Sequence, residues 1–169
     1  MLCWPSSPAG ATTPAQEQIS AGSLGLVSAA PNVTFSDTLN GKNQTPTATQ
    51  ALDIGDGRGS GAGWNITATS TTFTTGSVTL STTATTVQTT PTLACDAGAT
   101  CLLATNSISY PYTLPAASVA PTATKVFNSA ANTGMGDQTV TVTWTLTLPG
   151  NTLAGTYTST WTLSLVTGP

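Results

Sequence analysis

Two runs of alternating side chains near the C-terminus constrain the fold of this chain more than any other feature. In residues 139–148 every second residue is apolar, and the residues between them are all threonines. The alternation returns in residues 157–165, where Ser159 is the one small residue on the bulky side. A period of two is typical of a half-buried β-strand, whose successive side chains point to opposite faces of a sheet. The predicted inner positions are Val140, Val142, Trp144, Leu146 and Leu148, followed by Tyr157, Ser159, Trp161, Leu163 and Leu165.

The rest of the chain favours the same class of fold. Threonine is abundant throughout, and its branched side chain suits a strand better than a helix. No window shows helical periodicity, and no stretch approaches the roughly 18 consecutive apolar residues of a membrane span. The sequence therefore predicts an all-β, antiparallel sandwich of Greek-key or immunoglobulin-like type, with little or no helix and no membrane span.

The domain organisation follows from where the alternation begins. Residues 1–18 are rich in Pro, Ser, Thr and Ala without any period, which is typical of a flexible arm, and residues 19–169 are predicted to form one sandwich. Residues 37–63 are rich in turn formers and end in a run with glycine at every second position. Short strands are expected at residues 23–27, 33–35, 64–68 and 78–80.

The connection between the two C-terminal strands admits two geometries. A hairpin would place Trp144 opposite Trp161 in one sheet. A crossover would place the strands in different sheets, and the segment before Tyr157 favours it, because it resembles a tyrosine corner, in which the phenol bonds back to the preceding turn. In both geometries the two tryptophans enter the same core.

Three cysteines are present. Cys95 and Cys101 bracket five residues and are predicted to form a disulfide, which the chain-entropy model values at about 2 kcal/mol; two free thiols are the alternative. The spacing is not that of a zinc site, and the sequence has no histidine that could complete one. Cys3 is left without a partner.

The charged residues exclude several kinds of function. The chain has three Lys and Arg residues, six Asp and Glu residues and a net charge of −3, so it lacks the basic cluster that nucleic acid requires. Without histidine, and with scattered carboxylates, no catalytic triad or acid pair is evident, and we expect neither an enzyme nor a cofactor. Asp53 and Asp56 are a weak candidate calcium site, for which a tight turn with local pairing to Arg58 is the favoured alternative.

The C-terminal residues and a glycine-rich run together resemble a known family, the WxL domains. Two segments are similar to the paired Trp-x-Leu motifs of that family: Trp144-Thr145-Leu146, and Trp161-Thr162-Leu163 after Tyr157. The run before Trp64 resembles its glycine-rich stretch, and residues 22–26 resemble its opening. The motif positions are Trp64, Trp144, Leu146, Tyr157, Trp161 and Leu163, and the loop positions are Asp56, Gly57, Arg58, Gly59, Gly61 and Gly63.

The resemblance implies a non-catalytic, extracellular domain on the surface of a Gram-positive-type bacterium. Its expected partner is peptidoglycan or another wall glycan, bound non-covalently, with other surface proteins or further copies as possible companions. The tryptophans have two interpretations: either Trp144 and Trp161 form a platform for sugar rings, or they belong to the core, as their alternation with threonine favours. A different function stays open as well, because residues 153–161 are similar to the last strands of pilus and spore-coat sandwiches, whose subunits assemble into fibres by strand addition.

Overall fold

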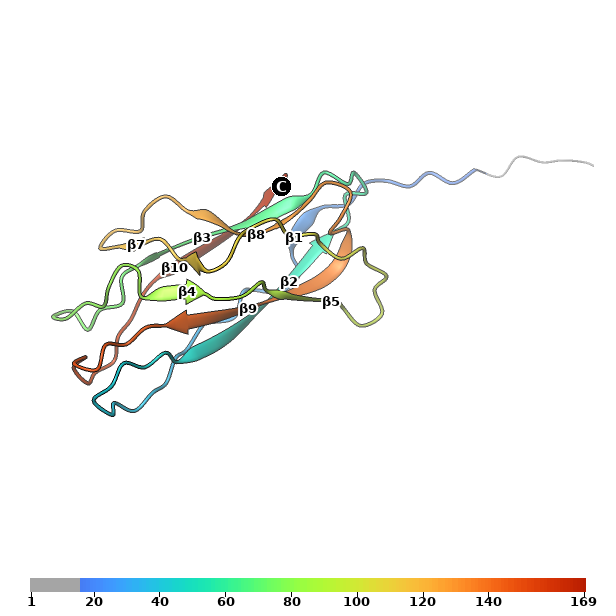
Figure 1. Cartoon of the computed structure of the whole chain (residues 1–169). Coiled ribbons are helices and arrows are strands. Elements are labelled where there is room, and N and C mark those ends of the chain that lie inside the picture. The colour runs from blue at the N-terminus through green and yellow to red at the C-terminus, as the bar shows by residue number, and fades with distance from the viewer. Residues whose placement is uncertain (1–15) are drawn as a thin grey trace, which may run out of the picture.

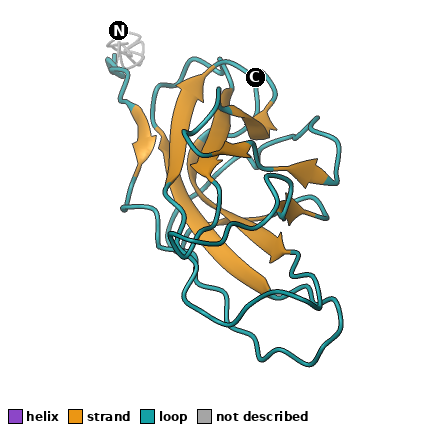
Figure 2. Cartoon of the chain, turned by 90° about the vertical axis from the view of Figure 1, so that its left-hand side faces the viewer, coloured by secondary structure: helices purple, strands orange, loops and turns teal. Residues whose placement is uncertain are grey.

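The computed structural model describes residues 16–169, which form two β-sheets packed face to face (Figure 1). Residues 1–15 lie outside the described part, and with them Cys3 and most of the predicted arm. Figure 2 shows strands and loops only, and residues 16–169 contain no helix that could cross a membrane. The predicted all-β sandwich is confirmed.

The first sheet contains six strands in the order β1-β2-β9-β4-β6, with β5 also paired to β9. The second sheet contains four strands in the order β10-β3-β7, with β8 also paired to β3. All pairs are antiparallel except the short pair β3–β7. The first sheet consists of β1 (Leu24–Leu26), β2 (Thr47–Asp56), β4 (Thr85–Val87), β5 (Thr92–Cys95), β6 (Tyr112–Thr113) and β9 (Gly136–Leu146), and the second of β3 (Trp64–Thr71), β7 (Ala116–Ala117), β8 (Thr124–Ser129) and β10 (Trp161–Thr167).

The two C-terminal strands lie in different sheets, so their connection is a crossover. β9 pairs with β2 along ten residues of the first sheet, and β10 pairs with β3 along seven residues of the second. The phenol of Tyr157 donates a hydrogen bond to the carbonyl of Leu153 at 3.0 Å, as expected of a tyrosine corner. The inner faces of β9 and β10 therefore meet across the sandwich, and their side chains share one core.

The prediction for residues 37–63, a region rich in turn formers, missed a long strand within them. Residues 47–56 form β2, and this strand pairs with β9 through its whole length. Its buried positions include Gln50 and Asp56, which are 3% exposed each. Polar residues on an inner face break the apolar alternation by which a strand is recognised, so this strand was missed.

Two other expected strands are also wrong. Residues 33–35 lie outside every strand, although the side chains of Val33 and Phe35 pack against the core. Residues 78–80 contribute only an isolated bridge between Thr74 and Thr79. In both places the apolar residues contact the core from a loop, which shows that side-chain burial alone does not require a ladder of backbone hydrogen bonds.

Candidate functional site

The two motif tryptophans of the C-terminal strands contact each other inside the sandwich. The rings of Trp144 and Trp161 pack edge to face, with centroids 4.8 Å apart. Trp144 is fully buried, and its indole N–H donates to Oε1 of Gln50 at 3.0 Å. Trp161 is only partly buried, because β10 lies at the margin of its sheet. Trp144 is thus part of the core, and only Trp161 can contact a ligand.

The early tryptophan is a second buried anchor. Trp64 is 0% exposed, and its indole N–H donates to the carbonyl of Gly134 at 2.9 Å. Its ring packs against Phe127, with centroids 5.8 Å apart. The two polar atoms of these buried indoles, in Trp64 and Trp144, are therefore satisfied within the domain, and neither ring presents a surface to the solvent.

The glycine-rich loop connects β2 to β3 and is held by Arg58. The guanidinium donates to both carboxylate oxygens of Asp56, each at 2.8 Å, and to the carbonyl of Gly63 at 2.8 Å. It also donates to Oγ1 of Thr167 at 3.1 Å. Arg58 thus ties the end of β2, the start of β3 and the end of β10 together, so the loop has a structural role at this end of the domain.

We expect Asp56→Asn to destabilise the domain in a pH-dependent way. The side chain of Asp56 is 1% exposed and that of Arg58 is 15% exposed. At neutral pH the free energy of unfolding should fall by about 2–3 kcal/mol. This lies at the low end of the cost of breaking a buried ion pair, because Arg58 keeps some contact with solvent. The hydrogen bonds from Arg58 lower the pKa of Asp56.

A depressed folded pKa means that the pair stabilises the domain above the unfolded pKa, about 3.9, and that this contribution disappears as pH falls through the folded value. The difference between wild type and Asp56→Asn should therefore shrink below about pH 4. Urea unfolding at pH 7 and at several acidic pH values measures it. A stability difference between the two proteins that is the same at every pH would contradict the lowered pKa of Asp56.

The structure does not support the weak calcium site at Asp53 and Asp56. Both residues lie in β2, three positions apart, so their side chains leave opposite faces of the strand. Asp56 is paired with Arg58, whereas the pKa of Asp53 is raised, first by burial and then by the neighbouring Asp96 and Asp137. Within residues 16–169 no group of three or more acidic, His or Cys side chains is placed to hold a metal ion.

The predicted disulfide between Cys95 and Cys101 is present. Its Cα atoms are 5.6 Å apart, and it closes the loop that follows β5. Leu102 directly after it bridges to Met135, just before β9. The disulfide therefore anchors an exposed loop to the first sheet, far along β9 from Trp144.

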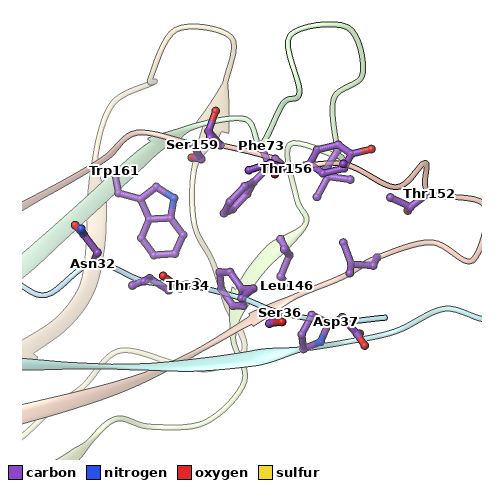
Figure 3. A pocket seen from close by; sticks show the side chains of 18 of the residues that line it. Asn32, Thr34, Ser36, Asp37, Phe73, Leu146, Thr152, Thr156, Ser159 and Trp161 are labelled. Carbon is purple, nitrogen blue, oxygen red and sulfur yellow. The ribbon is translucent and has the colours of Figure 1, made fainter. Parts of the chain in front are cut away.

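An open cleft lies at the end of the sandwich from which the loops after β3 and β9 extend. We define the cleft by its two walls, residues 30–39 and residues 152–163, and its volume is about 1240 Å³. Figure 3 shows Asn32, Thr34 and Ser36 along one wall and Thr152, Thr156 and Ser159 along the other. Phe73 and Leu146 lie between them.

A line of aromatic rings forms the apolar part of the cleft. Phe35 and Phe73 pack edge to face with centroids 6.0 Å apart, and Phe73 meets Trp161 at 6.3 Å in the same manner. Tyr157 also lines the cleft, and all four side chains are partly exposed. Hydroxyl and amide groups surround these rings, and Asp37 is the one charged residue among the lining residues.

The sequence prediction identified only part of this cleft. The motif residues that line it are Leu146, Tyr157, Trp161 and Leu163. Trp64, Asp56 and the glycines of the glycine-rich loop lie elsewhere. Phe35 was named only as part of an expected strand, and Phe73 was not singled out, because no local pattern marks either ring as part of a site. Pairs of aromatic residues that are distant in sequence meet only through the crossover of the sandwich, so no local signal reveals them.

Comparison with known protein families identifies the family of this chain. The family model for the WxL domain, described as a surface cell wall-binding domain, matches residues 4–169. No curated protein and no solved structure matches the chain. Since the matched region covers almost the whole sequence, the chain belongs to the WxL family of surface domains that bind the cell wall.

Proposed function

We propose that this domain attaches non-covalently to peptidoglycan and that the cleft holds the glycan. The observation that carries the proposal is the combination of four partly exposed aromatic rings with a surrounding set of hydroxyl and amide groups. Aromatic faces pack against the C–H faces of sugar rings, and neutral polar groups orient the sugar hydroxyls. The buried Trp144 supports the cleft through its contact with Trp161 rather than binding the ligand itself.

The charge of the cleft favours a neutral ligand. Asp37 is its one ionisable acid, and none of the lining residues is Lys or Arg. Lys42 and Lys125 are exposed elsewhere, and Arg58 is engaged by Asp56. Polyanionic ligands would need clustered cations, so the neutral glycan strand suits this site better than a phosphate-rich wall polymer does.

A large cation placed in the cleft should block wall binding. The side chains of Thr34 and Ser36 are exposed on the 30–39 wall, so the double variant T34R/S36R fills the cleft without disturbing the core. We expect affinity for purified sacculi to fall at least about tenfold, which corresponds to about 1.4 kcal/mol. Co-sedimentation of the domain with sacculi over a range of concentrations measures this.

A matched control carries the same change on another surface. Thr49 and Thr143 are exposed neighbours on the outer face of the first sheet, and T49R/T143R adds the same two charges there. This control should keep its affinity within about twofold, a free-energy change of about 0.4 kcal/mol. Loss of binding in the control alone would move the wall-binding surface to the threonine face, and unchanged binding of T34R/S36R would reject the cleft.

A further inference from the structure

β10 is a long, unprotected strand at the margin of the second sheet. It has seven residues, none of them charged and none of them proline, and it pairs only with β3. The other strands at the margins of the two sheets differ from it. β1, β6 and β7 have only two or three residues, β5 has four, and β8 carries Lys125 and faces an irregular register in β3. Short length, charge and bulges are the usual protection of a sheet edge against another strand, and β10 has none of them.

The backbone groups on the open side of β10 can be assigned from its ladder. Thr71 N–H bonds to the carbonyl of Thr160 at 2.9 Å, and Gly168 N–H bonds to the carbonyl of Gly63 at 3.1 Å. In an antiparallel pair, alternate residues direct both backbone groups to the same neighbour. The even-numbered residues of β10 therefore bond to β3, and Trp161, Leu163 and Leu165 direct theirs away from it. No residue in the range 16–169 bonds to these outward groups.

The side chains of β10 are incompletely buried in the same region. Trp161, Leu163 and Leu165 point inward but remain partly exposed, and Val166 on the outer face is 43% exposed. Leu26 of β1 lies beside Leu163 and Leu165 from the facing sheet, itself 40% exposed, without a backbone hydrogen bond to β10. Another strand beside β10 would satisfy the free backbone groups and cover these apolar side chains together.

We infer that β10 pairs with β10 of a second copy of this chain, in antiparallel orientation about a two-fold axis. This pairing joins the four-stranded sheets of the two copies into one continuous sheet. A two-fold axis makes each residue and its partner equivalent, so the free groups of Trp161, Leu163 and Leu165 meet identical groups. The inner leucines then face leucines. The strand carries no charge, so no like charges oppose one another in the pairing. A second copy is therefore the occupant that fits, and this inference goes beyond the proposed attachment to the wall.

A charge-swap experiment tests the pairing. Thr162, Ser164 and Val166 are exposed on the outer face, and any antiparallel register that uses the free backbone groups places these even-numbered positions opposite one another. The variant T162K/S164K/V166K and its counterpart T162E/S164E/V166E should each be monomeric, because like charges directly opposed are destabilising. Their equimolar mixture should form heterodimers. Each variant should retain the wild-type circular dichroism spectrum.

An interface of one strand pair is small and expected to be weak, so a high protein concentration is needed to populate it. Sedimentation velocity of the wild type at roughly 100 µM should therefore show dimers. A wild type that stays monomeric at this concentration would overturn the inference. So would dimers that survive in both charged variants, or a mixture that remains monomeric. Assemblies larger than dimers would require a contact at another surface and would also contradict two-fold pairing. The assay contains no wall material, so its result is independent of whether the cleft binds glycan.

Discussion

Replacing Trp144 with alanine should lower the free energy of unfolding by about 3–5 kcal/mol, the usual cost of deleting a buried tryptophan side chain. The ring is fully buried, packs edge to face on Trp161 at 4.8 Å and donates its N–H to Gln50. Truncation would leave a cavity and a buried amide oxygen without its donor, and both effects destabilise. Domains of this size are stable by about 5–15 kcal/mol, so the variant should be largely or partly unfolded at 37 °C.

Urea unfolding followed by circular dichroism measures this loss, and Thr143→Ala provides the control. Thr143 precedes Trp144 in β9 but is exposed on the outer face, so its truncation should change stability by less than about 0.5 kcal/mol. A Trp144→Ala protein that unfolds at the same urea concentration as the wild type and merely fails to bind sacculi would contradict the assignment of Trp144 to the core.

Gly63→Ala should be the most damaging substitution in the glycine-rich loop. Gly63 has a φ of 69°, a region in which an L side chain costs about 1–2 kcal/mol. A Cβ atom there would also overlap the backbone carbonyl of Ser129, and the carbon of Ala130 would lie only 3.1 Å from it. Forcing β3 and the end of β8 apart adds a cost of about 1–3 kcal/mol, by comparison with overpacked cores. We therefore expect a total loss of about 3–4 kcal/mol.

Gly59→Ala separates the two contributions. Gly59 has a similar φ of 63°, but a Cβ atom there would have no neighbour within 4 Å. This variant should lose only the conformational part, about 1 kcal/mol. Thermal or urea unfolding of both variants provides the comparison. Equal losses of unfolding free energy would contradict a cost from the close approach of Gly63 to Ser129.

The sequence predicted those parts of the fold in which the side-chain period and the burial agree. β9 and most of β10 were located because nearly every inner residue is apolar, although β10 begins at Trp161 rather than at Tyr157. The crossover followed from the residues before Tyr157. β2 was missed because Gln50 and Asp56 occupy inner positions. Both polar side chains have partners in the folded domain: Gln50 accepts from Trp144 and donates to the carbonyl of Pro31, both distant in sequence, whereas Asp56 binds Arg58, two residues further on.

The cleft could not have been predicted in full for a related reason. Its walls come from residues 30–39 and 152–163, which are brought together only when β10 joins the second sheet. The aromatic contacts of Phe73 with Phe35 and Trp161 depend on three-dimensional packing that no local pattern encodes. The motif tryptophans were identifiable, but their different roles follow from burial, since Trp144 is enclosed and Trp161 borders the cleft.

The central claim is that the WxL motif builds the sandwich while the adjoining cleft binds the wall. The most direct test is an NMR titration of the uniformly ¹⁵N-labelled domain with soluble glycan fragments from digested peptidoglycan. We predict that backbone amide shifts will cluster in residues 30–39 and 152–163, with smaller changes in the buried strands beneath. Shifts confined to the glycine-rich loop or to the outer threonine face, with the cleft amides unchanged, would contradict the claim.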